Sequence, residues 1–488
     1  MGRTVVIGLD GADWELLEDF IEDGTCPNIA RLAGDGVRGD MHSVHPPISV
    51  PAWLCTVTGK RPDRLDLYNF TRRKPNSYEM HRVHNSEEYQ RDAFWNELED
   101  VGIFNVPSTF PAGSYDGFLV AGPLSPGGTH PEDLEEELEE EGYVRSLPKG
   151  WQFEESLDVL ERNGDVAAEL LEERDPGFFM AVTSVPDRVQ HAYWGEEERM
   201  RELWEEVDRY VGKILEHVDL EEDDVFVISD HGFESIDKTF YLNTWLEENG
   251  YLETEGGGKV KEGVRFRLKK TAKEVLGKLG LLEFALENVP SRLRNAVENP
   301  EDIWDRIDWD ETTAFASGQY IGQVYINTEE DYPDGTVSGE EYEEVRNRLI
   351  SELEELEDPE TGEKVVEKVW KKEDLYRDFG EFAPDITFYT RGMGYKVKEE
   401  LHGSVFDESI PRGAHGQEGI LVAAGENVGE GKMDMELVDV APTLLHLEGR
   451  KIPGDMDGEA AGELFAEGSD PSEREVRVSG GETSGIDI

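Results

Sequence analysis

The chain has 488 residues, enough to bury a large core and to form two or three domains. It carries 110 Asp and Glu against 48 Lys and Arg, a formal charge of -62, which excludes a basic nucleic-acid-binding surface. Aromatic residues and short apolar stretches run through most of the chain, so we interpret the acidic excess as the solvated surface of a folded protein. Salt screens such self-repulsion, and we therefore expect a halophilic source.

Only two cysteines are present, Cys26 and Cys55, which excludes a disulfide framework and a cysteine-rich metal site. The sequence enters a strand-like apolar run almost at once, leaving no room for a signal peptide, and contains no apolar stretch of about 18 residues. We therefore expect a cytoplasmic protein that does not insert into a membrane.

Short apolar strands alternate with helical patterns from the start of the chain. Residues 4–9 read as a buried strand, and a helical pattern follows from about residue 13 to 32. The same strand, turn and helix theme returns at 117–121, 178–182, 225–229 and 419–424. This pattern predicts an α/β fold with a central, mainly parallel sheet sandwiched by helices, and catalytic groups at the carboxyl ends of its strands.

The character of the chain changes at 254–307, where a Gly-rich break, the pair Lys269-Lys270 and amphipathic segments occur. We predict a mostly helical inserted subdomain there, which covers or flanks the site and separates core parts at 1–253 and 308–466. An acidic amphipathic helix is expected at 340–356. The polar residues 467–488 are expected to form a disordered tail.

Two carboxylates directly follow predicted strands. Asp10 directly follows the first strand in Gly-Leu-Asp-Gly-Ala, where an aspartate by itself is more often the N-cap of the next helix. Asp230-His231-Gly232 repeats the arrangement and adds an imidazole, a pair of ligand types that suits zinc or manganese. A polar turn is the alternative reading of that second segment.

Three further residues supply candidate ligands. Asp187 and His191 are four residues apart after the strand at 178–182, so a helical turn presents both on one side, either as a metal clamp or as a surface contact. His415 lies between glycines just before the strand at 419–424. A lone loop histidine would be unremarkable, but a binuclear site needs about one more nitrogen than the other pairs provide.

Ser49 precedes an apolar, helix-like run that reaches Thr58-Gly59. A serine at a helix start is either an N-cap or a nucleophile whose substrate anion meets the helix N-terminus. The segment alone leaves both readings open.

The order of these motifs resembles the alkaline-phosphatase superfamily, specifically archaeal members of its type I phosphodiesterase and nucleotide pyrophosphatase branch. The resemblance extends over about residues 5–459. It includes Asn105-Val-Pro107, Ala383-Pro-Asp385 and the stretches 320–327, 439–443 and 452–458.

This resemblance implies two divalent metal ions and hydrolysis of a phosphodiester or phosphoanhydride bond in a small-molecule substrate. One ion would be held by Asp10, Asp230, His231 and the Ser49 oxygen, and the other by Asp187, His191 and His415. Zinc is the first choice because half the ligands are imidazoles, with manganese as the alternative. The reaction would pass through a phosphorylated or nucleotidylated Ser49, with the ions about 4 Å apart.

Several departures and alternatives stay open at this point. The nucleophile is usually threonine in the nucleotide-pyrophosphatase relatives, and Pro62-Asp-Arg-Leu-Asp66 replaces their Pro-x-x-His-Gly, so loop contacts to substrate are undetermined. A sulfatase would need arginine where Trp53 stands. A non-catalytic metal-binding protein would lack a ligand or the nucleophile, and all seven positions are chemically competent.

A phosphoglycerate mutase-like phosphotransferase is the main alternative, because it would use the same metals and a phosphoserine. Such an enzyme needs several arginines around a small acidic substrate. Arg72, Arg73 and Arg188 are the nearest in sequence to candidate residues, and we interpret them as solvent-facing. The remaining nearby histidines, interpreted as loop or core residues, are His42, His45 and His402.

Overall fold

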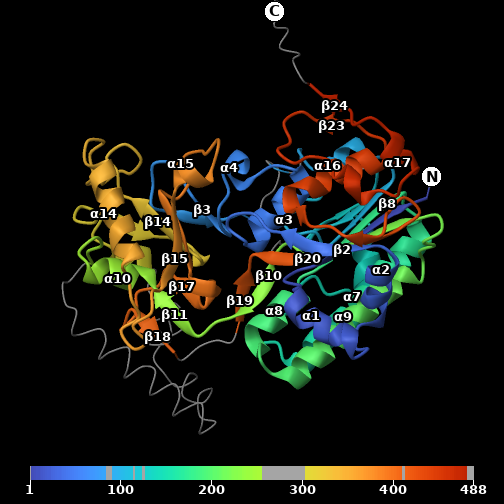
Figure 1. Cartoon of the computed structure of the whole chain (residues 1–488), viewed down its shortest axis with the longest axis horizontal. Coiled ribbons are helices and arrows are strands. Elements are labelled where there is room, and N and C mark those ends of the chain that lie inside the picture. The colour runs from blue at the N-terminus through green and yellow to red at the C-terminus, as the bar shows by residue number, and fades with distance from the viewer. Residues whose placement is uncertain are drawn as a thin grey trace, which may run out of the picture. The chain divides into compact units, whose positions relative to one another are not determined.

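The computed structural model describes residues 2–83, 89, 91–113, 116–123, 127–254, 303–408 and 413–480. The chain forms two compact units: the first comprises 1–70, 82–235 and 412–488, and the second 71–81 and 236–411. Figure 1 labels many of their elements. The division at 235/236 differs from the boundaries predicted at 253/254 and 307/308. Among the described residues, no helix has the length and apolar character needed to cross a bilayer.

The first unit is built on a ten-stranded sheet in the order β21-β2-β20-β9-β1-β8-β5-β6-β7, with β22 beside β2. Five adjacent strands, from β9 to β6, run parallel, which confirms the predicted α/β architecture. The strands are β1 Thr4–Leu9, β2 Val37–His42, β5 Val101–Phe104, β6 Gly117–Val120, β7 Thr129–His130, β8 Phe178–Thr183, β9 Asp224–Ile228, β20 Glu418–Gly425, β21 Gly431–Lys432 and β22 Met435–Glu436.

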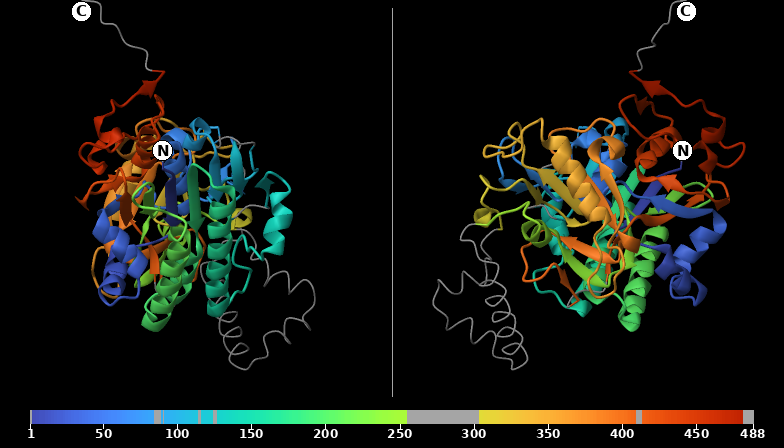
Figure 2. Two further views of the ribbon diagram at one scale, coloured as in Figure 1. Left: turned by 90° about the vertical axis from the view of Figure 1, so that its right-hand side faces the viewer. Right: turned by 60° about the vertical axis from the view of Figure 1, so that its left-hand side comes forward.

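Helices cover both faces of this sheet because its central strands are apolar on both sides. Val5 and Ile7 of β1 pack into one buried cluster, while Val6 packs into the other. The first cluster involves α1 Trp14–Glu22, α2 Pro27–Asp35, α6 Leu134–Glu140, α7 Phe153–Arg174, α8 Val185–Tyr193 and α9 Glu197–Leu215. The second involves α3 Ser49–Thr58, α4 Pro62–Leu65, η1 Phe94–Glu97 and α16 Val440–Leu447. Figure 2 shows α7 and α9 running alongside each other.

The helical pattern predicted from about residue 13 to 32 is two helices, α1 and α2. The break has a local cause: Gly24 has a left-handed φ of +85°, and Pro27 is the first residue of α2. Proline is tolerated at that position because its missing N–H has no intrahelical acceptor there. The two helices nevertheless pack on the same face of the sheet.

Strand β20 departs from the parallel theme, because it runs antiparallel to both β2 and β9. Leu421 pairs with Ile228, near the carboxyl end of β9. The amino end of β20 therefore lies at the edge of the sheet where the parallel strands end. Residues just before β20 are brought to the same place as residues just after β1, β8 and β9.

The second unit has its own apolar cluster around two four-stranded sheets. One contains β12 Ala314–Ala316, β14 Gly322–Ile326, β16 Ile386–Thr390 and β15 Val366–Lys371, and the other β13 Gln319–Tyr320, β17 Tyr395–Lys398, β11 Lys238–Tyr241 and β18 Phe406–Asp407. Among the described residues, its other elements are the pair β3 Thr71–Arg73 and β4 Met80–Arg82, and α10 Leu242–Glu248, η2 Ile303–Arg306, α14 Tyr342–Glu354, α15 Lys372–Leu375 and η3 Arg391–Met393. Helix α14 corresponds to the acidic helix predicted at 340–356. Most of the predicted insertion, at 255–302, lies outside the described residues, so its helical character stays a prediction.

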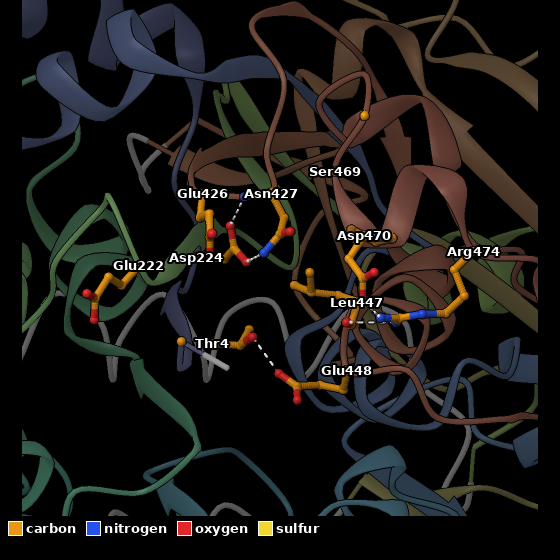
Figure 3. A pocket seen from close by; sticks show the side chains of 13 residues that line it. Thr4, Glu222, Asp224, Glu426, Asn427, Leu447, Glu448, Ser469, Asp470 and Arg474 are labelled. Atoms are coloured by element: carbon orange, nitrogen blue, oxygen red, sulfur yellow. Dashed lines mark hydrogen bonds and ion pairs between the residues drawn. The ribbon is translucent and has the colours of Figure 1, made fainter.

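Part of the predicted disordered tail is folded: residues 467–480 contain α17 Asp470–Glu473 and β24 Val478–Ser479, which pairs with β23 Ile452–Pro453. Arg474 anchors this segment by donating to the carbonyls of His446 and Leu447 at 2.7 and 3.2 Å. The segment lines a hollow of about 640 Å³ at the amino ends of β1 and β9 (Figure 3). There Asp224 accepts hydrogen bonds from Asn427, and Glu448 accepts one from Thr4.

Candidate metal centre

Asp10, Asp230 and His231 meet because they directly follow β1 and β9, which are neighbouring parallel strands. Asp10 is 2% exposed, and Asp230 and His231 are completely buried. The N-cap reading of Asp10 is wrong, since the N-cap of α1 is Asp13, whose carboxylate accepts from the Glu15 N–H. The Asp10 side chain is instead directed to the interior of the unit, at the carboxyl edge of the sheet.

Ser49 is the first residue of α3, and the N-cap of that helix is Ile48. Its hydroxyl therefore does not cap the helix. The Ser49 Oγ lies 3.4 Å from Asp10 Oδ1 and 3.1 Å from His231 Nε2. The helix start thus brings a hydroxyl to the two strand-end residues.

Asp187 and His191 lie on α8, which directly follows β8, and His415 lies in β19 (Gly413–Gly416), just before β20. Strand β19 pairs antiparallel with β10 (Gly232–Ser235), so His415 stands opposite Phe233. Asp187 Oδ1 is 3.2 Å from His191 Nε2 and 3.3 Å from His415 Nε2. The residues singled out from the sequence therefore gather in one buried place.

The three imidazoles share an orientation. Each Nδ1 faces a backbone carbonyl: that of His231 faces Gly232 O at 2.9 Å, that of His415 faces Pro47 O at 2.8 Å, and that of His191 faces Gly413 O at 3.3 Å. With Nδ1–H donating to these carbonyls, the Nε2 lone pairs point inward. The Nε2 atoms of His191 and His415 are only 3.1 Å apart, an arrangement that a cation stabilises.

Two carboxylate oxygens reinforce this reading. Asp187 Oδ1 and Asp230 Oδ2 are buried and face imidazole Nε2 atoms at 3.2–3.3 Å. When Nδ1 carries the ring proton these Nε2 atoms cannot donate, so neither oxygen has a hydrogen-bond donor among the described residues. Buried oxygens normally have a partner, because leaving one unpaired is costly. Two sets of three ligand atoms lie within 4.8 Å of one another, and both contain His231: one with Asp10 and Asp230, the other with Asp187 and His415. Buried oxygen and imidazole ligands fit one or more divalent ions.

The pKa values of the candidate ligands are also consistent with a bound cation. Burial, together with repulsion from neighbouring carboxylates, raises the pKa of Asp10 and of Asp230 well above the usual range. Burial and the neighbouring imidazoles lower the pKa of His231 and His415. For Asp187, burial raises the pKa, but the imidazoles of His191 and His415 outweigh it and leave the pKa well below its usual range. A bound cation would let these buried carboxylates stay ionised.

The loop after β1 is held by contacts with several other elements. Gly11 has a φ of +73° and donates its N–H to Asp230 Oδ1 at 3.3 Å, while Gln190 of α8 donates to its carbonyl at 2.8 Å. Ser229 Oγ accepts from the Ala12 N–H at 2.9 Å and donates to the His231 carbonyl at 2.6 Å. These bonds hold the ends of β1 and β9 and helix α8 at fixed positions relative to one another.

The other sequence candidates lie outside this group. His42 forms an ion pair with Glu418, and His402 stacks on Tyr241 in the second unit. Arg73 is buried in the second unit against Glu381, so its solvent-facing interpretation is wrong. Arg188 is half-buried and lies near enough to Asp10 for its positive charge to offset part of the rise in the Asp10 pKa.

Trp53 was not identified from the sequence as a site residue. Its indole N–H donates to Asp10 Oδ2 at 3.2 Å. The available signal was its spacing, one helical turn after Ser49 on the same helix.

Comparison with known proteins agrees with the geometry. An ectonucleotide pyrophosphatase/phosphodiesterase of Caenorhabditis elegans is 33% identical over 84 residues, which is 17% of this chain. The aligned stretch covers 10% of that relative's own length. A family model described as type I phosphodiesterase / nucleotide pyrophosphatase matches residues 4–418. The chain therefore belongs to the type I phosphodiesterase / nucleotide pyrophosphatase family.

Proposed function

We propose that this protein hydrolyses phosphodiester or phosphoanhydride bonds of small molecules, with Ser49 as the nucleophile. The observation that carries the proposal is the position of the Ser49 hydroxyl, 3.1 Å from His231 Nε2 and 3.4 Å from Asp10 Oδ1, at the start of a ten-residue helix. A hydroxyl among metal ligands and at a helix N-terminus is suited to attack on a phosphorus whose oxygens carry negative charge.

Two divalent ions fit the ligand set. We assign Asp10, Asp230 and His231, with the Ser49 oxygen, to one ion, and Asp187, His191 and His415 to the other. Zinc is the first candidate because imidazoles form half of the six Asp and His ligands, and manganese is the alternative. When bound, the ions lower the pKa of the Ser49 hydroxyl and offset negative charge on the phosphoryl oxygens.

The protein groups then have separate roles. Ser49 Oγ loses its proton and forms a bond to phosphorus, while the bond from phosphorus to the leaving oxygen breaks and that oxygen takes up a proton. A water molecule next attacks the same phosphorus, the Ser49–phosphorus bond breaks, and the proton returns to Ser49. Before the attack, Asp10 Oδ1 and His231 Nε2 face the Ser49 hydroxyl as hydrogen-bond acceptors and keep its oxygen beside the centre.

A nucleotide is the first substrate class to test, because the name of the C. elegans relative specifies nucleotide pyrophosphatase activity. The acidic composition supports a halophilic enzyme that works in high salt. Arg188 favours a second candidate, a phosphotransferase that returns the phosphoryl group to another hydroxyl. A half-buried arginine beside the centre could bind a further anionic group of such a substrate.

The first experiment compares hydrolysis of bis-p-nitrophenyl phosphate and p-nitrophenyl phosphate in molar KCl, using metal-free protein resupplied with zinc or manganese. We expect metal-dependent cleavage with preference for the diester, and Ser49→Ala should lose at least about 100-fold in rate. Ser156→Ala is the matched control, because Ser156 is also a buried helical serine and its hydroxyl donates to the Phe153 carbonyl of α7. Full activity of Ser49→Ala would refute the assignment of Ser49 as the nucleophile. Activity on phosphoglycerates instead of the diester would favour the phosphotransferase.

A further inference from the structure

We infer that Trp53 is a positioning residue whose indole N–H orients the Asp10 carboxylate toward the metal centre and Ser49. The inference rests on the proposed function, since the orientation of Asp10 matters to the reaction only if Asp10 is a ligand.

The two oxygens of Asp10 have different surroundings. Trp53 Nε1 donates to Oδ2 at 3.2 Å, while Oδ1 faces Ser49 Oγ at 3.4 Å and His231 Nε2 at 3.5 Å. Trp53 is completely buried, so water does not compete for this bond. The indole therefore engages one carboxylate oxygen and leaves the other directed at the centre.

The glycine in strand β1 leaves the space that the Trp53 indole occupies. Gly8 lies in β1 and Asp10 directly follows that strand, two residues later, and the Trp53 indole contacts both positions. A Cβ at Gly8 would lie 2.5 Å from Trp53 Cη2 and 2.7 Å from Val182 Cγ2, distances that real contacts do not reach. The six-membered ring of Trp53 thus occupies the space that glycine leaves, while the N–H reaches Asp10. Gly8 and Trp53 form a matched pair.

Helix α3 consequently contributes two side chains to the centre. Its first residue, Ser49, supplies the hydroxyl, and Trp53, four residues later, fixes the carboxylate that the hydroxyl contacts. Hydrogen bonds to the outer atoms of metal ligands fix ligand orientation, and their removal typically costs 10–100-fold in metal affinity.

The test uses Trp53→Phe, which keeps an aromatic ring and removes the N–H. Trp95→Phe is the matched control: Trp95 is 1% exposed, belongs to the same apolar cluster, and its Nε1 has no hydrogen-bond partner among the described residues. Zinc affinity is measured by competition with a chromophoric chelator in molar KCl. We expect wild type and Trp95→Phe to bind two ions alike, and Trp53→Phe to lose about 10–100-fold in affinity for one of them.

Equal zinc affinities in Trp53→Phe and Trp95→Phe would overturn the positioning role while leaving the proposed function intact. Failure of the wild type to bind zinc or manganese would overturn both. A second measurement does not depend on Trp53→Phe folding: the indole ¹⁵N–H signals are recorded during zinc titration of Trp194→Phe. This variant lacks the indole that packs on Phe233, the ring that His191 also contacts. One indole signal should shift with the first ions bound, and a spectrum without such a shift would overturn the inference.

Discussion

Gly11→Ala tests whether the close approach of α8 to the loop after β1 builds the centre. The φ of +73° at Gly11 lies in the left-handed region, which costs a residue with a Cβ about 1–2 kcal/mol. The new Cβ would also lie 3.3 Å from Asp187 Cβ and from Gln190 Nε2, so α8 must move by a few tenths of an ångström. Overpacking of this kind adds roughly 1 kcal/mol or more.

Gly24→Ala provides the control, because Gly24 has a similar φ of +85° and nothing within 4 Å of its Cβ position. Denaturant unfolding in molar KCl should show a loss of about 1–2 kcal/mol for Gly24→Ala and about 2–3 kcal/mol or more for Gly11→Ala. Only Gly11→Ala should also weaken zinc binding, since α8 carries Asp187 and His191. Equal losses of stability and unchanged zinc affinity would refute the role of close packing.

Three other predictions follow from features described above. His191→Ala should bind one zinc ion fewer than the wild type in equilibrium dialysis, and unchanged stoichiometry would contradict the ligand grouping. Burial raises the pKa of Glu448, so any stabilisation that its protonated form provides is present at low pH and is lost as pH rises through the folded-state pKa. Glu448→Gln should therefore raise the free energy of unfolding at neutral pH and give no gain below about pH 4, as urea titrations at several pH values will show. Arg474→Ala should lower that free energy by about 1–3 kcal/mol through loss of charge-assisted bonds to the end of α16, and thermal denaturation unchanged from wild type would contradict the anchoring role.

Much of the candidate centre could be predicted from the sequence because parallel strands end at one edge of a sheet. Asp10 and Asp230 follow apolar runs that are recognisable as buried strands, and this placed both at the same edge. His415 precedes its strand, so the same rule would have put it at the opposite edge. Its presence in the centre depends on the antiparallel direction of β20, which no local pattern encodes.

Other features were hidden for different physical reasons. The second unit groups 71–81 with residues far along the chain, as in the stacking of Tyr78 on Trp309, and such long-range contacts leave no periodic signal in sequence. The hydrogen bond from Trp53 to Asp10 depends on three-dimensional packing over Gly8, whereas an apolar helix position predicts only a core residue. The break between α1 and α2, in contrast, was visible in Gly24 and Pro27, which are ordinary helix-end signals.

The pairing of β10 with β19 has a consequence for how the centre is assembled during synthesis. Ser235 pairs with Gly413, so the two ends of the whole stretch 236–411 must meet before His415 reaches His191 and Asp187. Closing so long a loop carries a large entropic cost unless the stretch folds first into a body with neighbouring ends. A nascent chain can therefore arrange Asp10, Ser49, Asp230 and His231 early, and it acquires its last imidazole only after most of the second unit has been made. If two ions bind as proposed, metal uptake in a cell-free translation reaction would accordingly occur in two stages, with the ion beside His415 bound last.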